Sequence, residues 1–228
     1  MLRRTSAFNR AVVGLAVVGL VALGAAACGS SNKPSGSKAA GSGKTLVVEN
    51  NPQPNFTQTF NPFAATSTGK SQNALALFYE PLMQFNNLKA GTTYPWLAKS
   101  FTWSPDGKSI TFQLRDGVKW SDGQPFTADD VAYTFQLMQQ NKALNYIGVP
   151  ITGTTTSGTD SVTISFASAQ YTQIYGIAGQ TWIVPKHIWS QQSDPTTFTD
   201  PNPVGTGPYL MDKFTAQGFT LKANPTYW

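Results

Sequence analysis

Two stretches in the middle of the chain alternate apolar and polar residues, which is the pattern of a half-buried β-strand. The first, residues 101–114, contains the turn sequence Asp106-Gly107 and predicts a β-hairpin with one buried face. The second, residues 161–167, predicts a further strand. The apolar positions of these two stretches are Ile110, Phe112, Leu114, Val162, Ile164 and Phe166.

Helical spacing appears between them. Residues 129–140 carry apolar side chains at intervals of three and four, which predicts an amphipathic helix. Thr127 precedes the helix and Asp130 follows three positions later, so the pair fits a capping box. The face expected to be buried holds Val131, Phe135 and Met138.

Residues 71–83 predict a second helix, ended by Pro81. Its expected apolar face consists of Leu75, Phe78 and Leu82. The remaining segments are a strand at 44–50, an irregular proline-rich stretch at 51–63, an apolar stretch at 180–189 and a strand-like segment at 218–228. Strands and helices mix without regular β-α-β spacing, so the expected class is α+β or mixed α/β.

Charge is unevenly distributed along the 228 residues. Six of the 16 lysines and arginines precede Thr45, which leaves 10 cations against all 11 acids in the remainder. The net charge of that remainder is therefore close to −1, although the formal net charge of the whole chain is +5. The pattern provides no basic face for nucleic acid.

The N-terminus resembles a secretion signal. Residues 1–10 are basic, residues 11–27 are apolar and rich in Gly and Ala, and Cys28, the only cysteine, follows "GAAA". We expect residues 1–27 to be a lipoprotein signal peptide and Cys28 to be lipidated, with an uncleaved anchor or ordinary secretion as alternatives. Residues 28–44 are then a flexible tether with a mean reach of roughly 20 Å. A single cysteine cannot form an intrachain disulfide.

Four aspartates lie within 15 positions around Trp120, which is expected to be exposed: Asp116, Asp122, Asp129 and Asp130. Such a cluster could bind calcium, flank a sugar, or form turns and a helix start. Two of the four precede glycine, which is typical of turns, and the other two fall at the start of the expected helix. The spacing is not that of an EF-hand, and no apolar environment singles out a catalytic acid. The sequence favours the structural interpretation.

Two other motifs indicate little chemistry. His187 is the only histidine, and without a nucleophile motif it cannot complete a catalytic triad. We expect it to pack after a strand. The sequence "GTGPY" lacks the spacing of a phosphate-binding loop and is expected to be a tight turn.

Seven segments resemble, in order, the family 5 extracellular solute-binding proteins. One is "LRDGVKWSDGQPFTADDVAYTF", residues 114–135. The others are "FNPF", "LFYEPLMQFN", "WLAKSFTWSPDGKSITFQLRDGVKW", "IVPKHIW", "NPVGTGPYLM" and "LKANPTYW". The resemblance covers about residues 45–228. It implies a periplasmic-binding-protein-like type II fold, with two lobes around a cleft and an extra subdomain in the first lobe.

Family members usually have more than twice this length, so the resemblance implies a truncated chain that lacks the second lobe. Residues 45–66 and 176–228 would belong to the base domain, and residues 67–175 would form the inserted subdomain. Aromatic and amide side chains suit a cleft for extended ligands. Asn51, Phe63 and Trp182 are therefore the ligand-binding candidates.

The resemblance implies the binding component of an ABC importer, which would capture a peptide-like or oligosaccharide solute and deliver it to membrane permease subunits. No catalytic residue, metal or cofactor is implied. The protein would be anchored by lipid to the outer face of the cytoplasmic membrane. Two alternatives remain: a secreted hydrolase acting through the residues from Asp116 to Asp130, and a sensor or adhesin that reuses the binding fold.

Overall fold

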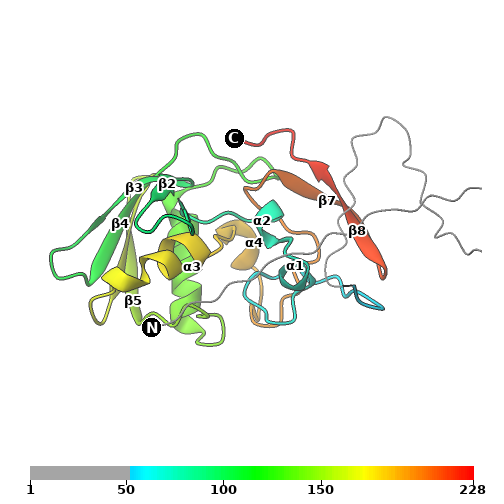
Figure 1. The fold of residues 1–228 in the computed structure, drawn as a ribbon, viewed down its shortest axis with the longest axis horizontal. Helices are drawn as coiled ribbons and strands as arrows, with labels where there is room; N and C mark the ends of the chain where they lie inside the picture. Colours follow the sequence, from blue (N-terminus) through cyan, green and yellow to red (C-terminus); the bar gives the residue numbers. More distant parts are fainter. Residues whose placement is uncertain (1–51) are drawn as a thin grey trace, which may run out of the picture. The chain divides into compact units, whose positions relative to one another are not determined.

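The computed structural model describes residues 52–228, which lie within one compact unit of the chain, residues 48–228 (Figure 1). The expected signal peptide, Cys28, the strand at 44–50 and Asn51 lie outside the described residues. Residues 52–63 contain no helix or strand, as the prolines predict.

The predicted hairpin is confirmed and belongs to a larger sheet. β3 (Ala98–Trp103) and β4 (Ser109–Leu114) pair in antiparallel fashion across the Asp106-Gly107 turn. Gly107 has φ of 67°, a conformation that glycine adopts without strain. β6 (Ser161–Phe166) pairs with β4, and β5 (Ile151–Ser157) pairs with β6, so the strand order is β3-β4-β6-β5.

One face of this sheet forms a core with α3 (Ala128–Gln140), which packs against β5 and β6 (Figure 1). All six apolar strand positions expected to be inside are at most 3% exposed. The helix positions Val131, Phe135 and Met138 are fully buried. The capping box is present, and the Thr127 N–H donates to Asp130 Oδ2 at 2.9 Å.

Trp120 is fully buried, so the expectation that it is exposed is wrong. Gly117 and Gly123, with φ of 74° and 91°, turn the chain back over the start of α3. The Trp120 indole N–H then donates to Asp130 Oδ2 at 3.2 Å, and its ring contacts that of Phe126. A tryptophan flanked by polar turn residues has little local sign of burial, because its partner belongs to the next element.

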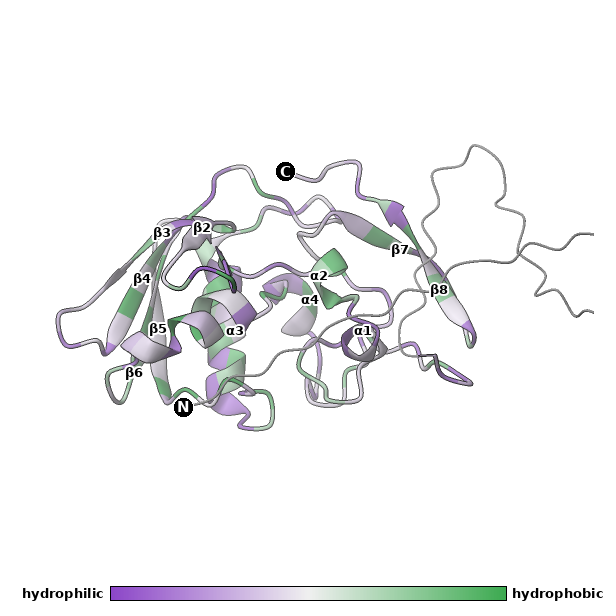
Figure 2. Cartoon of the chain, in the orientation of Figure 1, coloured by the Kyte–Doolittle hydropathy of each residue, from purple (hydrophilic) through white to green (hydrophobic). Residues whose placement is uncertain are grey.

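The single helix predicted at 71–83 is also wrong. The chain forms two one-turn helices, α1 (Thr68–Ser71) and α2 (Leu75–Phe78), with a break between them. Asn73, at the break, has φ of 53°, which asparagine tolerates better than most residues. Leu75, Phe78 and Leu82 are nonetheless buried, and α2 is apolar in Figure 2.

Two small antiparallel pairs complete the strands. β1 (Met83–Phe85) pairs with β2 (Thr93–Pro95), and β7 (Tyr209–Thr215) pairs with β8 (Gly218–Ala223). β8 confirms the strand expected in the last segment. The connection from β6 contains η1 (Tyr171–Gln173), the π-helix η2 (Tyr175–Gln180) and α4 (Lys186–Trp189). The stretch predicted to be apolar is inside, since Ile183, Val184 and Trp189 are fully buried.

A second packed region surrounds Phe60, whose ring meets those of Phe78, Phe214 and Phe219 edge-on. Backbone segments also approach each other closely in this region, because the Gly207 N–H donates to the Phe78 carbonyl at 2.8 Å. The described part of the chain contains no helix long and apolar enough to cross a membrane.

Candidate ligand-binding site

Three of the four clustered aspartates make contacts on the surface. The pairs are Asp116 with Lys99 at 2.9 Å, Asp122 with His187 at 2.7 Å and Asp129 with Lys186 at 2.9 Å. His187, which was expected to pack, keeps 37% of its side chain exposed, and its contact is an ion pair only when the ring is protonated. Exposed pairs of this kind contribute little to stability.

Asp130, the fourth aspartate, is buried and connects three segments. One oxygen accepts from the Thr127 N–H and the Trp120 indole, and the other accepts from the Lys186 N–H at 2.9 Å. Asp130 therefore fastens the turn loop and the start of α4 to the first turn of α3. This arrangement supports the structural interpretation of the aspartate cluster.

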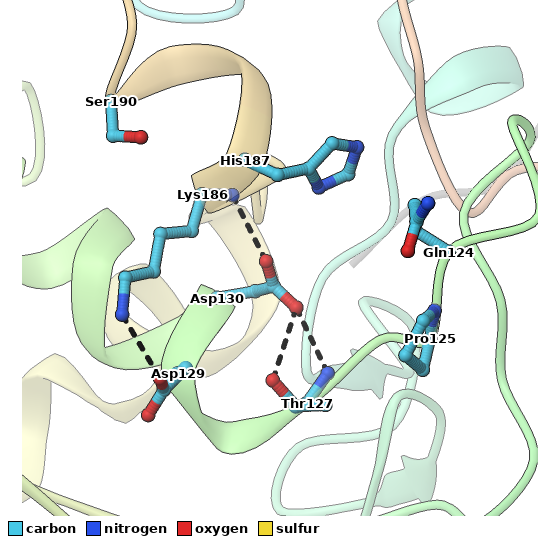
Figure 3. A pocket seen from close by; sticks show the side chains of 8 residues that line it. All are labelled: Gln124, Pro125, Thr127, Asp129, Asp130, Lys186, His187 and Ser190. Atoms are coloured by element: carbon cyan, nitrogen blue, oxygen red, sulfur yellow. Dashed lines mark hydrogen bonds and ion pairs between the residues drawn. The ribbon is translucent and has the colours of Figure 1, made fainter.

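A shallow hollow of about 320 Å³ lies beside these residues. Its lining consists of Gln124, Pro125, Thr127, Asp129, Asp130, Lys186, His187 and Ser190. Figure 3 shows Lys186 directed at Asp129, and Asp130 held by the backbone of Lys186 and by Thr127. Within this hollow, the Lys186 ammonium is thus paired with the Asp129 carboxylate, and Asp130 accepts from backbone N–H groups and the Trp120 indole. His187 pairs with Asp122, which lies outside the lining. No group of His, Cys, Asp and Glu in residues 52–228 is arranged to hold a metal ion.

Of the candidates inferred from sequence, Phe63 and Trp182 lie in the described part of the chain. Phe63 is 4% exposed and packs edge-on against Trp189, with ring centroids 5.3 Å apart. Trp182 is partly exposed and lines a second hollow. Phe63 therefore supports this region from within, whereas Trp182 reaches its surface.

Tyr146 joins these two residues. Its ring lies 6.1 Å from that of Phe63, and its hydroxyl accepts from the Trp182 N–H at 3.3 Å. The same hydroxyl donates to the Gln180 carbonyl at 2.7 Å, and the Lys70 ammonium lies 5.3 Å from the ring centroid. Sequence reasoning missed Tyr146, because a single tyrosine in the loop between α3 and β5 has no distinguishing pattern.

The two ends of Tyr146 have different environments. The residue is 38% exposed, so part of its ring is available to a ligand. Its hydroxyl is held by backbone groups, and burial raises the pKa of this hydroxyl well above its usual value. Tyr146 therefore presents a fixed, neutral aromatic face, which suits stacking against an extended ligand.

The second hollow has a volume of about 190 Å³, and four of its ten lining residues are aromatic, so we call it the aromatic hollow. Its lining consists of Ala76, Tyr79, Glu80, Pro81, Gln84, Trp96, Gly179, Trp182, Pro208 and Tyr227. Ala76 lies in α2, Gln84 in β1 and Gly179 in η2, and the other lining residues lie in the connections next to α2, β2, η2, β7 and β8. The hollow forms only because distant parts of the chain converge there.

The π-helix η2 connects the hollow to Tyr146. Gly179 lines the hollow, and the next residue, Gln180, accepts the Tyr146 hydroxyl. A Cβ added at Gly179 would lie 2.5 Å from the ring of Phe85, so a larger residue would displace that ring. π-helical turns are rare and occur frequently at functional sites. Tyr146, Trp182 and the hollow together form the candidate site.

Solved structures of binding proteins share this fold. An oligopeptide-binding protein of an ABC transporter from Thermotoga maritima, with mannohexaose bound, has a TM-score of 0.66 and 28% identity over 76% of this chain and 32% of that one. NikA from Brucella suis, in complex with Fe(III)-EDTA, has a TM-score of 0.64 and 27% identity. The match covers 78% of this chain and 36% of NikA. The fold is thus that of a periplasmic binding protein, of which the described residues cover part.

The family follows from the sequence. The model of the bacterial extracellular solute-binding proteins, family 5 (middle region), matches residues 92–228, and the chain belongs to this family. The probable peptide-binding protein YejA of Agrobacterium fabrum is 29% identical over 178 residues, which is 75% of this chain and 29% of YejA. The chain spans about a third of the length of the relatives it matches.

Proposed function

We propose that the protein is the binding component of an ABC importer and captures a peptide-like or oligosaccharide solute outside the cytoplasm. The observation that carries the proposal is the convergence of Tyr146, Trp182 and the aromatic hollow in a member of a solute-binding family. Fixed aromatic faces bind sugar rings and peptide groups without covalent chemistry. Similar proteins carry the names of oligopeptide-binding proteins, and one holds mannohexaose.

Within this site, Trp182 and Tyr146 would contact the ligand, and Phe63 would hold Tyr146 in place. Asn51 remains a proposed ligand contact. A catalytic role for the aspartate cluster has no support in its geometry, because Asp130 caps α3 and the other three aspartates make surface pairs.

The proposed division into a base domain and an inserted subdomain assigns residues 45–66 and 176–228 to the base and residues 67–175 to the insertion. The sheet from β3 to β6 with α3 is consistent with a separate subdomain. α2, in contrast, contacts β7, and β1 contacts η2, which favours an insertion that begins after β1.

Binding can be measured by calorimetry on the purified chain, with tri- to pentapeptides and mannohexaose as probes. Trp182→Ala and Tyr146→Ala should each weaken binding about tenfold, given about 0.5–1.5 kcal/mol for an aromatic contact in addition to the area that it buries. Tyr171→Ala is the matched control, because Tyr171 is 46% exposed and lies outside the site. If all three variants bind as the unmodified chain does, the assigned site is wrong.

We also propose that residues 1–27 are a lipoprotein signal peptide, that Cys28 is lipidated and that the protein delivers its solute to permease subunits. The motivation is the sequence "GAAAC" and the polar tether that follows it. In the native host, the protein should partition into detergent, and Cys28→Ser should release it or leave it unprocessed. A native protein that is soluble and begins elsewhere would contradict the anchor.

A further inference from the structure

A carboxylate forms part of the wall of the aromatic hollow. Glu80 is 3% exposed and lines the hollow. Its oxygens accept the Trp96 indole N–H at 2.9 Å, the Tyr227 hydroxyl at 2.7 Å and the Trp228 indole N–H at 2.9 Å. All of these donors are neutral aromatic groups, so they orient the carboxylate without cancelling its charge.

No lysine, arginine or histidine pairs with Glu80 among residues 52–228, where the ion pairs involve other residues. Arg115 contacts two of the residues that donate to Glu80, but no ion pair joins it to the carboxylate. Its guanidinium carbon is 4.6 Å from the centroid of the Trp228 ring, and its Nε–H donates to the Trp96 carbonyl at 2.8 Å. Arg115 thus contacts the Trp228 ring and the Trp96 backbone and does not pair directly with the carboxylate. A buried charge without a directly paired counter-charge is costly, and a cationic ligand group would reduce that cost.

We propose that Glu80 and the surrounding aromatic rings form a subsite for an ammonium group of the ligand. The proposal rests on the proposed function, because it assigns one charged group to the captured solute. Aromatic faces attract cations, and a carboxylate offers about four acceptor positions, of which the described hydrogen bonds use three. At about 190 Å³, the hollow fits the end of a charged side chain or a terminal amine, but not a whole peptide.

The test uses n-butylammonium chloride as probe, with n-butanol at equal concentration and sodium chloride at equal ionic strength as controls. The indole N–H signals of the six tryptophans report binding in ¹⁵N-labelled protein. Butylammonium should shift the signals of Trp96, Trp182 and Trp228, and neither control should. The signals of Trp120 and Trp189, which are fully buried, should not move. Equal shifts with butanol would overturn the proposal.

Two variants separate charge from packing. Glu80→Gln removes the charge and keeps the size, and it should weaken butylammonium binding about tenfold or more. Unchanged Trp120 and Trp189 signals would verify its fold. Trp182→Leu leaves every hydrogen bond of the carboxylate intact and should weaken binding by about three- to tenfold, through loss of one aromatic face. Undiminished binding in both variants would contradict the subsite.

Three tripeptides then identify the source of the ammonium group and separate this proposal from the proposed function. Ala-Ala-Ala offers a terminal amine, N-acetyl-Ala-Lys-Ala-amide offers a side-chain ammonium, and N-acetyl-Ala-Ala-Ala-amide offers neither. Tighter binding of one charged peptide supports the subsite and names its ligand group. If the neutral peptide binds as tightly as both, the subsite is wrong while the binding function stands. If no peptide or sugar binds, the function is wrong, and the butylammonium titration alone decides the subsite.

Discussion

The sheet region, residues 98–166, and the aromatic region, residues 56–85 with 199–228, are held together differently. In the sheet region, β3 pairs with β4 and β5 with β6, so most partners are neighbours in sequence. In the aromatic region, Phe60 meets Phe214 and Phe219, and the Tyr79 hydroxyl donates to Asp200, 121 positions away. The first region depends on local pattern, and the second depends on contacts that the chain must close over long distances.

The largest expected effect tests whether the two regions unfold together. Phe112→Ala in the sheet region and Phe60→Ala in the aromatic region each empty a site that is fully buried. Each should lower the free energy of unfolding by about 3–5 kcal/mol. Because both regions lie in one compact unit, urea transitions followed by tryptophan fluorescence and by circular dichroism should coincide in each variant. Separate transitions in Phe60→Ala alone would show that the regions are independent.

The close backbone approach in the aromatic region has no equivalent in the sheet region. A Cβ at residue 207 would lie 2.6 Å from the Leu77 carbonyl oxygen and 2.7 Å from that of Phe78. Gly207→Ala should therefore lower the free energy of unfolding by about 3 kcal/mol, because backbone atoms cannot move aside as a side chain can. Gly218→Ala is the matched control, since nothing lies within 4 Å of a Cβ there. Equal urea midpoints for the two variants would contradict the close approach.

Asp200 makes the aromatic region sensitive to pH. Burial raises the pKa of its carboxyl from 3.8 to about 6, against a smaller lowering by the Tyr79 hydrogen bond. The stabilisation from proton binding is complete below pH 3.8 and is lost as the pH rises through about 6. Asp200→Asn is neutral at every pH and tolerates the φ of 49°. It should raise stability at pH 7.5 by about 1–3 kcal/mol and lose this advantage near pH 4.

Thermal unfolding of both proteins from pH 4 to 8 measures this difference. Asp194→Asn provides the control, because Asp194 is exposed and hydrogen bonds from Thr196 lower its pKa. No gain at pH 7.5 is expected there. An Asp200→Asn curve parallel to that of the unmodified protein would show that the pKa of Asp200 is the same in the folded and unfolded protein, which would contradict its raised pKa.

The smallest effect concerns the sheet region. Thr127→Ala removes one side chain of the capping box and should cost about 0.5–2 kcal/mol, measured as a lower melting temperature. Thr127→Ser keeps the hydroxyl and should restore most of the loss. Peptide binding should not change, because Thr127 lies outside the candidate site. Lost binding with an unchanged melting temperature would give Thr127 a functional role.

The sequence could predict the sheet region because its information is local. The alternation at Ile110 and Phe112, the turn at Gly107 and the cap at Thr127 all act within a few residues. The break at Asn73 could not be predicted, because helical spacing continues across it and only packing against distant segments requires the turn. Trp120 was misjudged for the same reason.

The candidate site shows the same division. Trp182 was a candidate because aromatic side chains suit a cleft for extended ligands, whereas Tyr146 is defined only by contacts with Phe63 and Gln180. Glu80 lies in a motif that supported the family resemblance. Its role in the hollow depends on Trp96 and Tyr227, which follow it by 16 and 147 positions. No pattern within one segment could reveal these hydrogen bonds to Glu80.

The π-helix η2 has a consequence for changes in chain length. The backbone hydrogen bonds of a π-helix join residues five positions apart, whereas those of an α-helix join residues four apart. The segment from Tyr175 to Gln180 therefore has one more residue in its turn than an α-helical turn would need. A one-residue deletion there would leave a helical turn intact and draw the Gln180 carbonyl away from the Tyr146 hydroxyl. Insertions and deletions in this segment would thus reposition one wall of the site and spare the fold, which offers a route to altered ligand size.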